Sequence, residues 1–126
     1  MTGAEQTFDV LHVIWHGDVL PEHVLQLGEI LASMPGRDRG VFVVSHCSDM
    51  GIPLASTRRA HANDPNVRWM GDIVIIGASV RIRIVVSMFN KAMAILRLSQ
   101  VPLTFVDTEA EAMAFVARRR AAKAAR

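Results

Sequence analysis

The stretch from Asp72 to Leu98 constrains the fold of this chain more than any other part of the sequence. It opens with Ile73–Ile76, four β-branched residues without a charge, which is the pattern of a strand buried on both faces. Gly77 interrupts the run, and Ser79 is a good helix N-cap because its hydroxyl can accept a hydrogen bond from a free backbone amide. The stretch therefore predicts a buried strand, a tight turn and a long helix, which is half of a βαβ unit.

The helix predicted from Val80 to about Leu98 is apolar on more than one side. One set of residues recurs at helical spacing and is expected to face the core: Ile82, Val85, Val86, Phe89, Met93 and Leu96. A second apolar row lies off that stripe: Ile84, Met88, Ile95 and Leu98. A helix that is apolar nearly all round is either buried or meets a partner. We expect the second row to form the interface of a homodimer, because isologous pairs are the commonest oligomers.

The remaining chain alternates between strand and helix patterns. Apolar runs at Val41–Val44 and Leu103–Val106 predict two further buried strands, which with Ile73–Ile76 form a parallel core. The alternating polarity of Phe8–His16 predicts a strand at an edge of the sheet, and the polar residues 1–7 are expected to be frayed. Helices are predicted between the strands and after the last one. The order β-α-β-α-β-α-β-α indicates an α/β fold with a mostly parallel sheet covered by helices.

Length and charge add further expectations. A chain of 126 residues with 51 % hydrophobic content is expected to form one domain. Residues 1–56 carry two arginines and seven carboxylates, whereas residues 57–126 carry twelve lysines and arginines and five carboxylates. We expect a core from about residue 8 to 117 and a solubilising basic tail at 118–126. The alternatives are that the acidic and basic halves face each other, or that the basic half faces an anionic partner.

The cellular setting follows from cysteine usage and hydropathy. Cys47 is the only cysteine, which excludes an intrachain disulfide and suits a reducing cytoplasm. No charged-then-apolar leader precedes Phe8, and no apolar segment is long enough to span a bilayer. We therefore expect a cytoplasmic protein with neither a membrane span nor a nucleic-acid partner.

Three sequence motifs carry a resemblance to a known family. They are Trp15–Gly17 followed by Leu20–His23, the turn Ile75–Arg83, and the segment Val101–Ala112. With them the chain resembles the STAS domain of anti-sigma-factor antagonists, and more closely the SpoIIAA-like (STAS/CRAL-TRIO-like) bacterial family, from about residue 8 to 117. The resemblance implies a STAS-like fold and a non-enzymatic regulatory module. Its partner is expected to be a protein, such as an anti-sigma factor or a kinase-like regulator.

The resemblance also implies candidate switch residues. STAS antagonists present a phosphorylatable serine after the second core strand, typically in an Asp-x-Ser context. Here Ser45 takes the aspartate position, Cys47 stands where the serine is expected, and Ser48 is out of register. Ser45 and Ser48 are therefore the candidate phospho-acceptors, and we expect both to be exposed at the carboxyl edge of the sheet near a helix start.

The alternative function is binding of a small apolar or anionic ligand between the long helix and the sheet, as in CRAL-TRIO-like pockets. The start of the long helix is a candidate anion site, because free amides and the helix dipole favour negative charge there. Its residues are Gly77, Ala78, Ser79, Arg81 and Arg83. The competing interpretation of this segment is an ordinary N-cap with two solvated arginines.

Enzymatic and metal chemistry find little support in the sequence. No G-x-S-x-G, P-loop or G-x-G-x-x-G motif is present, and we predict no catalytic residue and no cofactor. On one strand His46 and Cys47 point to opposite faces, so they cannot pair, and we expect Cys47 to be buried and inert. His12 and His16 lie about 13 Å apart along a strand, too far for one metal ion. His46 on a neighbouring strand could reach one of them, but no third ligand is evident, and we predict no metal site.

Overall fold

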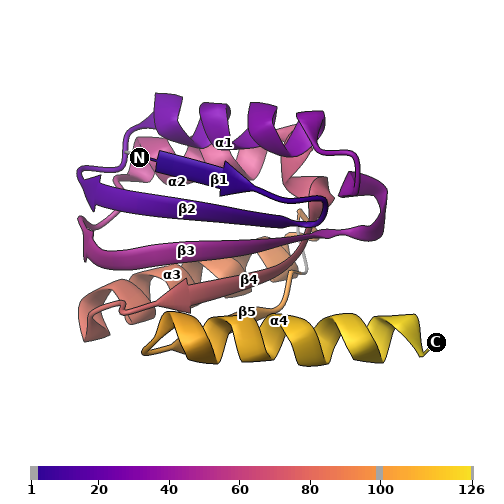
Figure 1. Cartoon of the computed structure of the whole chain (residues 1–126). Coiled ribbons are helices and arrows are strands. Elements are labelled where there is room, and N and C mark those ends of the chain that lie inside the picture. The colour runs from indigo at the N-terminus through magenta and orange to yellow at the C-terminus, as the bar shows by residue number, and fades with distance from the viewer. Residues whose placement is uncertain (1–2, 99–100, 126) are drawn as a thin grey trace.

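The structure is a computed structural model that describes residues 3–98 and 101–125 (Figure 1). Within these residues, five strands form one sheet in the order β1-β2-β3-β4-β5: β1 Gly3–Gln6, β2 Val10–Gly17, β3 Val41–Met50, β4 Met70–Ile76 and β5 Leu103–Val106. Four α-helices and two short 3₁₀ helices connect or follow them: α1 Pro21–Ser33, η1 Arg37–Arg39, α2 Ala55–Asn63, η2 Pro65–Trp69, α3 Val80–Ile95 and α4 Glu109–Ala124. None of the described helices is both long and apolar enough to cross a bilayer.

The predicted α/β class and element order are confirmed for the strands β2 to β5, which are all parallel. The prediction that Phe8–His16 lies at an edge is wrong, because β2 pairs with β3 on one side and antiparallel with β1 on the other. β1 comes from residues expected to be frayed. Its register, with Gly3 opposite Ile14 and Gln6 opposite Leu11, relies on backbone hydrogen bonds, which need no apolar side chain.

The helices divide unequally between the two faces of the sheet. The parallel strands follow one another in chain order, so right-handed crossovers place α1, α2 and α3 on the same face, while α4 returns over the other (Figure 1). The core on the three-helix face draws buried residues from β2, β3, α1 and α3, among them Leu11, Val13, Val43, Leu27, Leu31, Ile82 and Met93. This face therefore holds the larger of the two hydrophobic cores.

The α4 face has a smaller core and remains partly open. Ala112 and Val116 of α4 are fully buried against side chains from the central strands: Val10, Phe42, Val44, Val74 and Ile76. Figure 1 shows α4 over the β4–β5 side of the sheet; α4 helps to bury Val10 at the start of β2 but does not lie over the later residues of that strand. Ile14 of β2 is accordingly exposed.

The basic C-terminal segment belongs to the fold, contrary to the expectation of a tail at 118–126. It is helical through Ala124 as the end of α4. Arg119 Nε and Lys123 Nζ each lie 3.5 Å from a carboxylate oxygen of Asp72, which is 1 % exposed. Those distances are within ion-pair range but long for hydrogen bonds. Arg120 donates two hydrogen bonds, at 2.9 and 2.8 Å, to Asp9. The alternative expectation, that the acidic half 1–56 and the basic half 57–126 face each other, holds for the Asp9–Arg120 pair, whereas the contacts of Asp72 lie within the basic half.

Candidate functional site

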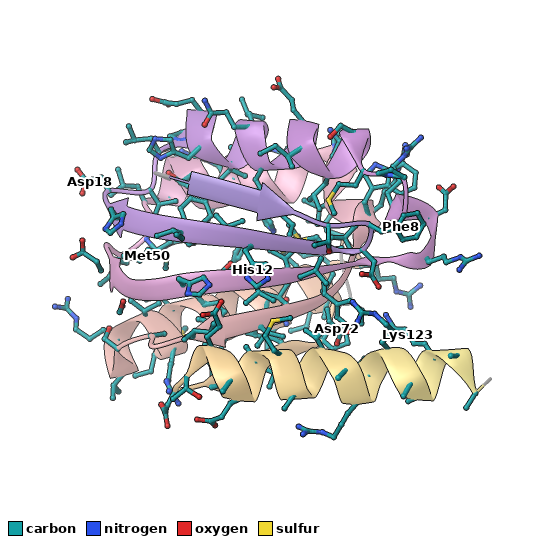
Figure 2. The ribbon with its side chains drawn as sticks, in the orientation of Figure 1. Phe8, His12, Asp18, Met50, Asp72 and Lys123 are labelled. Carbon is teal, nitrogen blue, oxygen red and sulfur yellow. The ribbon has the colours of Figure 1, made fainter. Side chains whose placement is uncertain are left out.

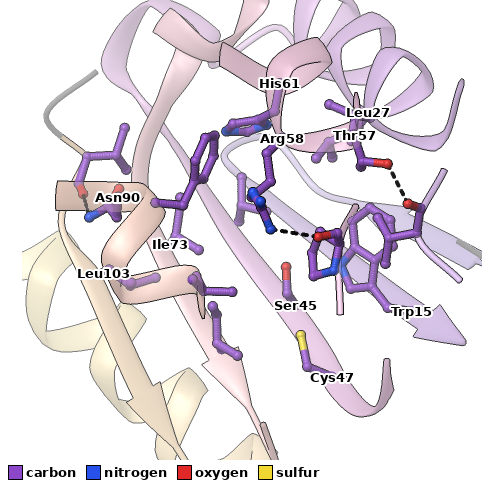
Figure 3. Close-up of a pocket in the computed structure, with 18 of the residues that line it drawn as sticks. Trp15, Leu27, Ser45, Cys47, Thr57, Arg58, His61, Ile73, Asn90 and Leu103 are labelled. Carbon is purple, nitrogen blue, oxygen red and sulfur yellow. Dashed lines mark hydrogen bonds between the residues drawn. The ribbon is translucent and has the colours of Figure 1, made fainter. Parts of the chain in front are cut away.

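A cavity of about 140 Å³ lies on the three-helix face, between the sheet and the helices α2 and α3 (Figure 3). It exists because α3 does not lie flush on the strands. Val85, Val86 and Phe89, which were expected in the core, are only partly buried and line this space. Strand residues on the opposite wall are Trp15, Val43, Ile73, Ile75 and Leu103. The cavity wall is therefore mostly aliphatic and aromatic carbon.

The floor of the cavity is strand β3, whose alternation directs Val43, Ser45 and Cys47 to this side. Burial raises the pKa of the Cys47 thiol to about 12, so the sulfur stays protonated at neutral pH. His46 points to the other face, where its ring meets His12. The expectation that His46 and Cys47 cannot pair is thus confirmed, and Cys47 is not an activated nucleophile.

The helix α2 supplies the polar part of the wall. Thr57 is buried and donates through Oγ1 to the carbonyl of Val19 at 2.7 Å, which joins α2 to the loop after β2. Arg58 donates through Nη1 to the carbonyl of Pro53 at 2.9 Å (Figure 3). No ion pair between described residues includes Arg58. Its guanidinium therefore lines the cavity without a carboxylate partner in the described part of the chain.

His61, one turn beyond Thr57, is the third polar residue of α2 at the cavity. Burial lowers its pKa, an effect that the nearby Asp64 carboxylate only partly opposes. The imidazole is therefore neutral at pH 7. Its ring meets Phe89 of α3 edge-on, with centroids 5.7 Å apart. A neutral ring suits a cavity whose wall is largely apolar.

The helix α3 is tied to the far side of the cavity by Asn90. Its Nδ2 donates to the carbonyl of Val101 at 3.2 Å, next to β5 (Figure 3). A pocket between the long helix and the sheet was predicted from the sequence, but none of the polar residues of α2 was predicted to line it. Thr57 and His61 are four residues apart and therefore lie on one face of α2. This spacing is the sequence signal that could have pointed to that face as part of the site.

The two candidate phospho-acceptors have different surroundings. Ser45 is buried in the cavity floor, so the expectation that it is exposed is wrong; β3 continues to Met50 and its alternation turns Ser45 inward. Ser48 is exposed, beside the turn that precedes α3. Gly77 has a φ of +70° in that turn, and a Cβ built on it would lie 3.3 Å from Ser48 Cβ. The role of Ser48 as a phospho-acceptor stays a prediction.

The candidate anion site at the start of α3 is partly occupied by the protein's own groups. Ser79 is the predicted N-cap, with its Oγ accepting from the amide of Ile82 at 3.3 Å. Arg83 turns back to donate to the carbonyl of Ala78 and to Asp107 Oδ1, both at 3.2 Å. Arg81 is exposed. An anion at this turn would compete with Asp107 for Arg83, and these contacts favour the N-cap interpretation.

The apolar row predicted on the outer side of α3 is on the surface. Its four members are between 52 % and 81 % exposed: Ile84, Met88, Ile95 and Leu98. Leu96, expected in the core, is 67 % exposed instead. α3 ends at Ile95, and Leu96 as its C-cap is followed by Arg97 with a φ of +58°, so the chain turns away from the core there. A dimer through this row stays a prediction.

Comparison with protein-family models, with curated proteins and with solved structures finds no match to this chain. The resemblance to the STAS and SpoIIAA-like family therefore stays a prediction from three sequence motifs.

Proposed function

We propose that this protein is a binding module for a small, mostly apolar ligand held between α2, α3 and the sheet. The observation that carries the proposal is the cavity of about 140 Å³ beneath α3, walled by apolar side chains and bordered by a few polar groups of α2. Apolar space with a small number of placed polar groups is the usual character of a small-molecule site. This is the alternative function that the sequence analysis derived from the STAS/CRAL-TRIO-like resemblance.

The size of the cavity limits the ligand. An apolar protein cavity of about 150 Å³ holds a molecule the size of benzene. The wall is apolar where the rings of Trp15 and Phe89 lie, which suits an aromatic ring or a short alkyl chain. The larger volumes typical of cofactors, above about 300 Å³, would require α3 to move outward.

The positive charge of Arg58 in the cavity wall suggests which polar group the ligand carries. Arg58 is a cation without a described ion-pair partner, and its guanidinium already donates to one carbonyl while other N–H groups remain. Arginine matches carboxylates through two parallel hydrogen bonds. The neutral ring of His61 and the amide of Asn90 add no opposing charge. The ligand class that fits best is a small aromatic or short-chain carboxylate.

Isothermal titration calorimetry with benzoate and with benzyl alcohol tests this proposal, because the two probes share a ring and differ in charge. We expect benzoate to bind more tightly to the unmutated protein. The Arg58→Gln variant should bind benzoate at least about tenfold more weakly, because a hydrogen bond to a charged group contributes about 1.5–3 kcal/mol. Arg59→Gln is the matched control, since Arg59 is the next residue of the same helix and is exposed.

A second pair of variants tests the location of the ligand. Val86 lines the cavity, and Val86→Phe should fill part of it and weaken the binding of both probes. Ile84→Phe adds the same ring to the exposed side of α3 and should leave binding unchanged. If neither probe binds the unmutated protein at millimolar concentration, or if both phenylalanine variants bind equally well, the proposal is wrong. Thermal melts of each variant show whether a loss of binding reflects unfolding.

The exposed row of α3 supports a second candidate function, the protein-interaction module that the sequence predicts. Three large apolar side chains on one solvent-facing side of α3 (Ile84, Met88 and Ile95), with Leu98 exposed beyond the end of the helix, are unusual unless they meet another surface. The two candidates are compatible, because the inner side of α3 lines the cavity while the outer side carries the row. The anti-sigma factor and kinase-like partners implied by the resemblance belong to this second candidate, and so does Ser48 as a switch.

A further inference from the structure

Three side chains with metal-ligating atoms converge on the face of the sheet opposite the cavity. His12, His46 and Glu109 each offer one ligand atom, and these atoms all lie within 4.8 Å of one another. The two imidazole rings are 5.9 Å apart between centroids and tilted by 35°. Both histidines are half-buried and Glu109 is exposed. Figure 2 shows His12 on the side of the sheet that α4 covers only in part.

The two histidines meet because of the register of β2 and β3. These strands are parallel, and Ile14 lies opposite His46, so His12 is two residues before that position on the same face. Residues of both strands on the other face, such as Val13 and Cys47, belong to the three-helix core. The alternation of each strand thus directs both imidazoles toward the open part of the α4 face.

Glu109 reaches the histidines because of its place in α4. It is the first residue of that helix, three positions before Ala112 and seven before Val116, and all three therefore lie on one side of the helix. Ala112 and Val116 are fully buried against the sheet, so Glu109, one turn earlier in α4, also faces the sheet. Glu111, two residues on, is directed elsewhere and forms the N-terminal cap with Thr108.

We propose that His12, His46 and Glu109 form a binding site for a divalent transition-metal ion, for which Zn²⁺ is the reference ion. Two imidazoles and one carboxylate are a ligand set that zinc and other first-row divalent metals use. Ligand atoms around a tetrahedral zinc are about 3.3 Å apart, given metal–nitrogen bonds of about 2.0–2.1 Å. The distances between the three ligand atoms are at most 4.8 Å, so each would need to shorten by no more than about 1.5 Å for a zinc ion to bind. The exposed side chain of Glu109 can do so by a rotamer change.

The site has the composition of an open metal centre. Three protein ligands leave at least one position of a tetrahedral ion for water or an external ligand, as in catalytic rather than structural zinc sites. Because both histidines are only half-buried and Glu109 is exposed, solvent or an external ligand can reach the ligand atoms. The site is separate from the cavity, because the sheet lies between His46 and the cavity residue Cys47. Its test is therefore independent of the ligand proposed above.

Metal titration of the intact protein tests the site, with Zn²⁺ followed by calorimetry and Co²⁺ by its visible absorption, which reports coordination geometry. We expect one equivalent of each ion to bind and Mg²⁺ not to bind, because magnesium prefers oxygen ligands. His12→Ala, His46→Ala and Glu109→Gln should each lower the Zn²⁺ affinity at least tenfold. Even loss of a group that only supports a metal ligand costs about 10–100-fold.

Two matched variants separate this site from ordinary surface binding. His16 is a histidine on the same strand and face, already hydrogen-bonded at 2.8 Å to Asp49, and His16→Ala should keep the Zn²⁺ affinity. Glu111→Gln removes a carboxylate from the same helical turn and should also keep it. If the unmutated protein binds no Zn²⁺ at 100-fold excess over protein, or if His16→Ala weakens binding as much as His12→Ala, the assignment is overturned. Circular dichroism of each variant verifies that the fold is retained.

Discussion

The helices α3 and α4 are each sixteen residues long and lie on opposite faces of one sheet, yet they are held in different ways. α4 buries Ala112 and Val116 completely, and ion pairs join its last turns to the buried Asp72. α3 buries Ile82 and Met93, but the inward residues between them are only partly buried because the cavity lies beneath. α4 is therefore seated directly on the sheet, whereas α3 spans the cavity.

The difference shows that apolar content does not decide how firmly a helix is held. α3 carries large apolar side chains on its inner and its outer sides, whereas the seated side of α4 includes an alanine that lets the backbone approach the strands. Side chains that border a space lack contact partners there and lose dispersion energy. We therefore expect α3 to be the element that adjusts when a ligand enters, and α4 to be the rigid support that places Glu109.

The largest expected effect comes from removing the cations that hold α4. In the double variant Arg119→Ala/Lys123→Ala, the carboxylate of Asp72 stays buried without its two ion-pair partners. Leaving one member of a buried pair uncompensated costs about 3–5 kcal/mol. Because the two cations are themselves about one-third exposed, we expect the lower end, about 3 kcal/mol. Urea denaturation followed by circular dichroism measures the loss.

The control for this experiment is Arg118→Ala, since Arg118 is an exposed cation of the same helix and forms none of the described ion pairs. Its free energy of unfolding should stay within about 0.5 kcal/mol of the unmutated protein. A double variant that is as stable as the control would show that α4 is held by its apolar contacts alone. α3 and α4 would then not differ through the ion pairs of α4.

The same substitution in both helices gives the most direct test of the comparison. Val116→Ala in α4 removes two methyl groups from a fully buried position and should cost about 2 kcal/mol, from lost transfer energy and a new void. Val86→Ala in α3 removes them beside space that already exists, and should cost less than about 1 kcal/mol. Urea titration of the two variants side by side measures the difference. Equal costs would contradict the view that α3 spans a cavity.

Much of the fold could be predicted from local patterns. The apolar runs that became β3, β4 and β5 and the cap at Ser79 are properties of neighbouring residues, so sequence alone locates them. The strand β1 could not be predicted in this way, because its pairing uses backbone groups that every residue carries. The basic end of the chain resembled a solvated tail, because its partner Asp72 lies far away in the sequence.

For the candidate sites too, features set by neighbouring residues could be predicted, and features set by tertiary packing could not. A pocket beneath the long helix was predicted from a resemblance, but three of its polar residues, Thr57, Arg58 and His61, come from α2, which has no strong apolar pattern. Ser45 was expected to be exposed at the carboxyl edge of the sheet, whereas β3 continues to Met50 and strand alternation turns Ser45 inward. The approach of Glu109 to His12 and His46 depends on where α4 crosses the sheet. Such crossings are set by tertiary packing, so no spacing within the sequence reveals them.

A smaller effect on the free energy of unfolding, absent at neutral pH, is expected from His61, where α2 meets α3. Burial holds the pKa of His61 below its ordinary value of 6.5, so the unfolded chain takes up the proton first as the pH falls. The titration of His61 therefore lowers the free energy of unfolding below about pH 6.5 and has no effect on it above that pH. In His61→Leu the free energy of unfolding should fall less between pH 7 and pH 5 than in the unmutated protein. Urea titrations at both pH values measure this, and equal slopes would contradict a buried, neutral imidazole against Phe89.

The smallest expected change in stability, with a large change in association, concerns the outer side of α3. Met88 is 66 % exposed in the middle of the apolar row, so Met88→Glu should change the free energy of unfolding by no more than about 0.5 kcal/mol. If the row is the interface of a symmetric dimer, the substitution places two buried charges near the twofold axis and shifts the protein to monomer. Light scattering of both proteins at high micromolar concentration measures the shift. An unmutated protein that is monomeric under these conditions would rule out the dimer, and the exposed row would then belong to the spanning helix without a second copy to cover it.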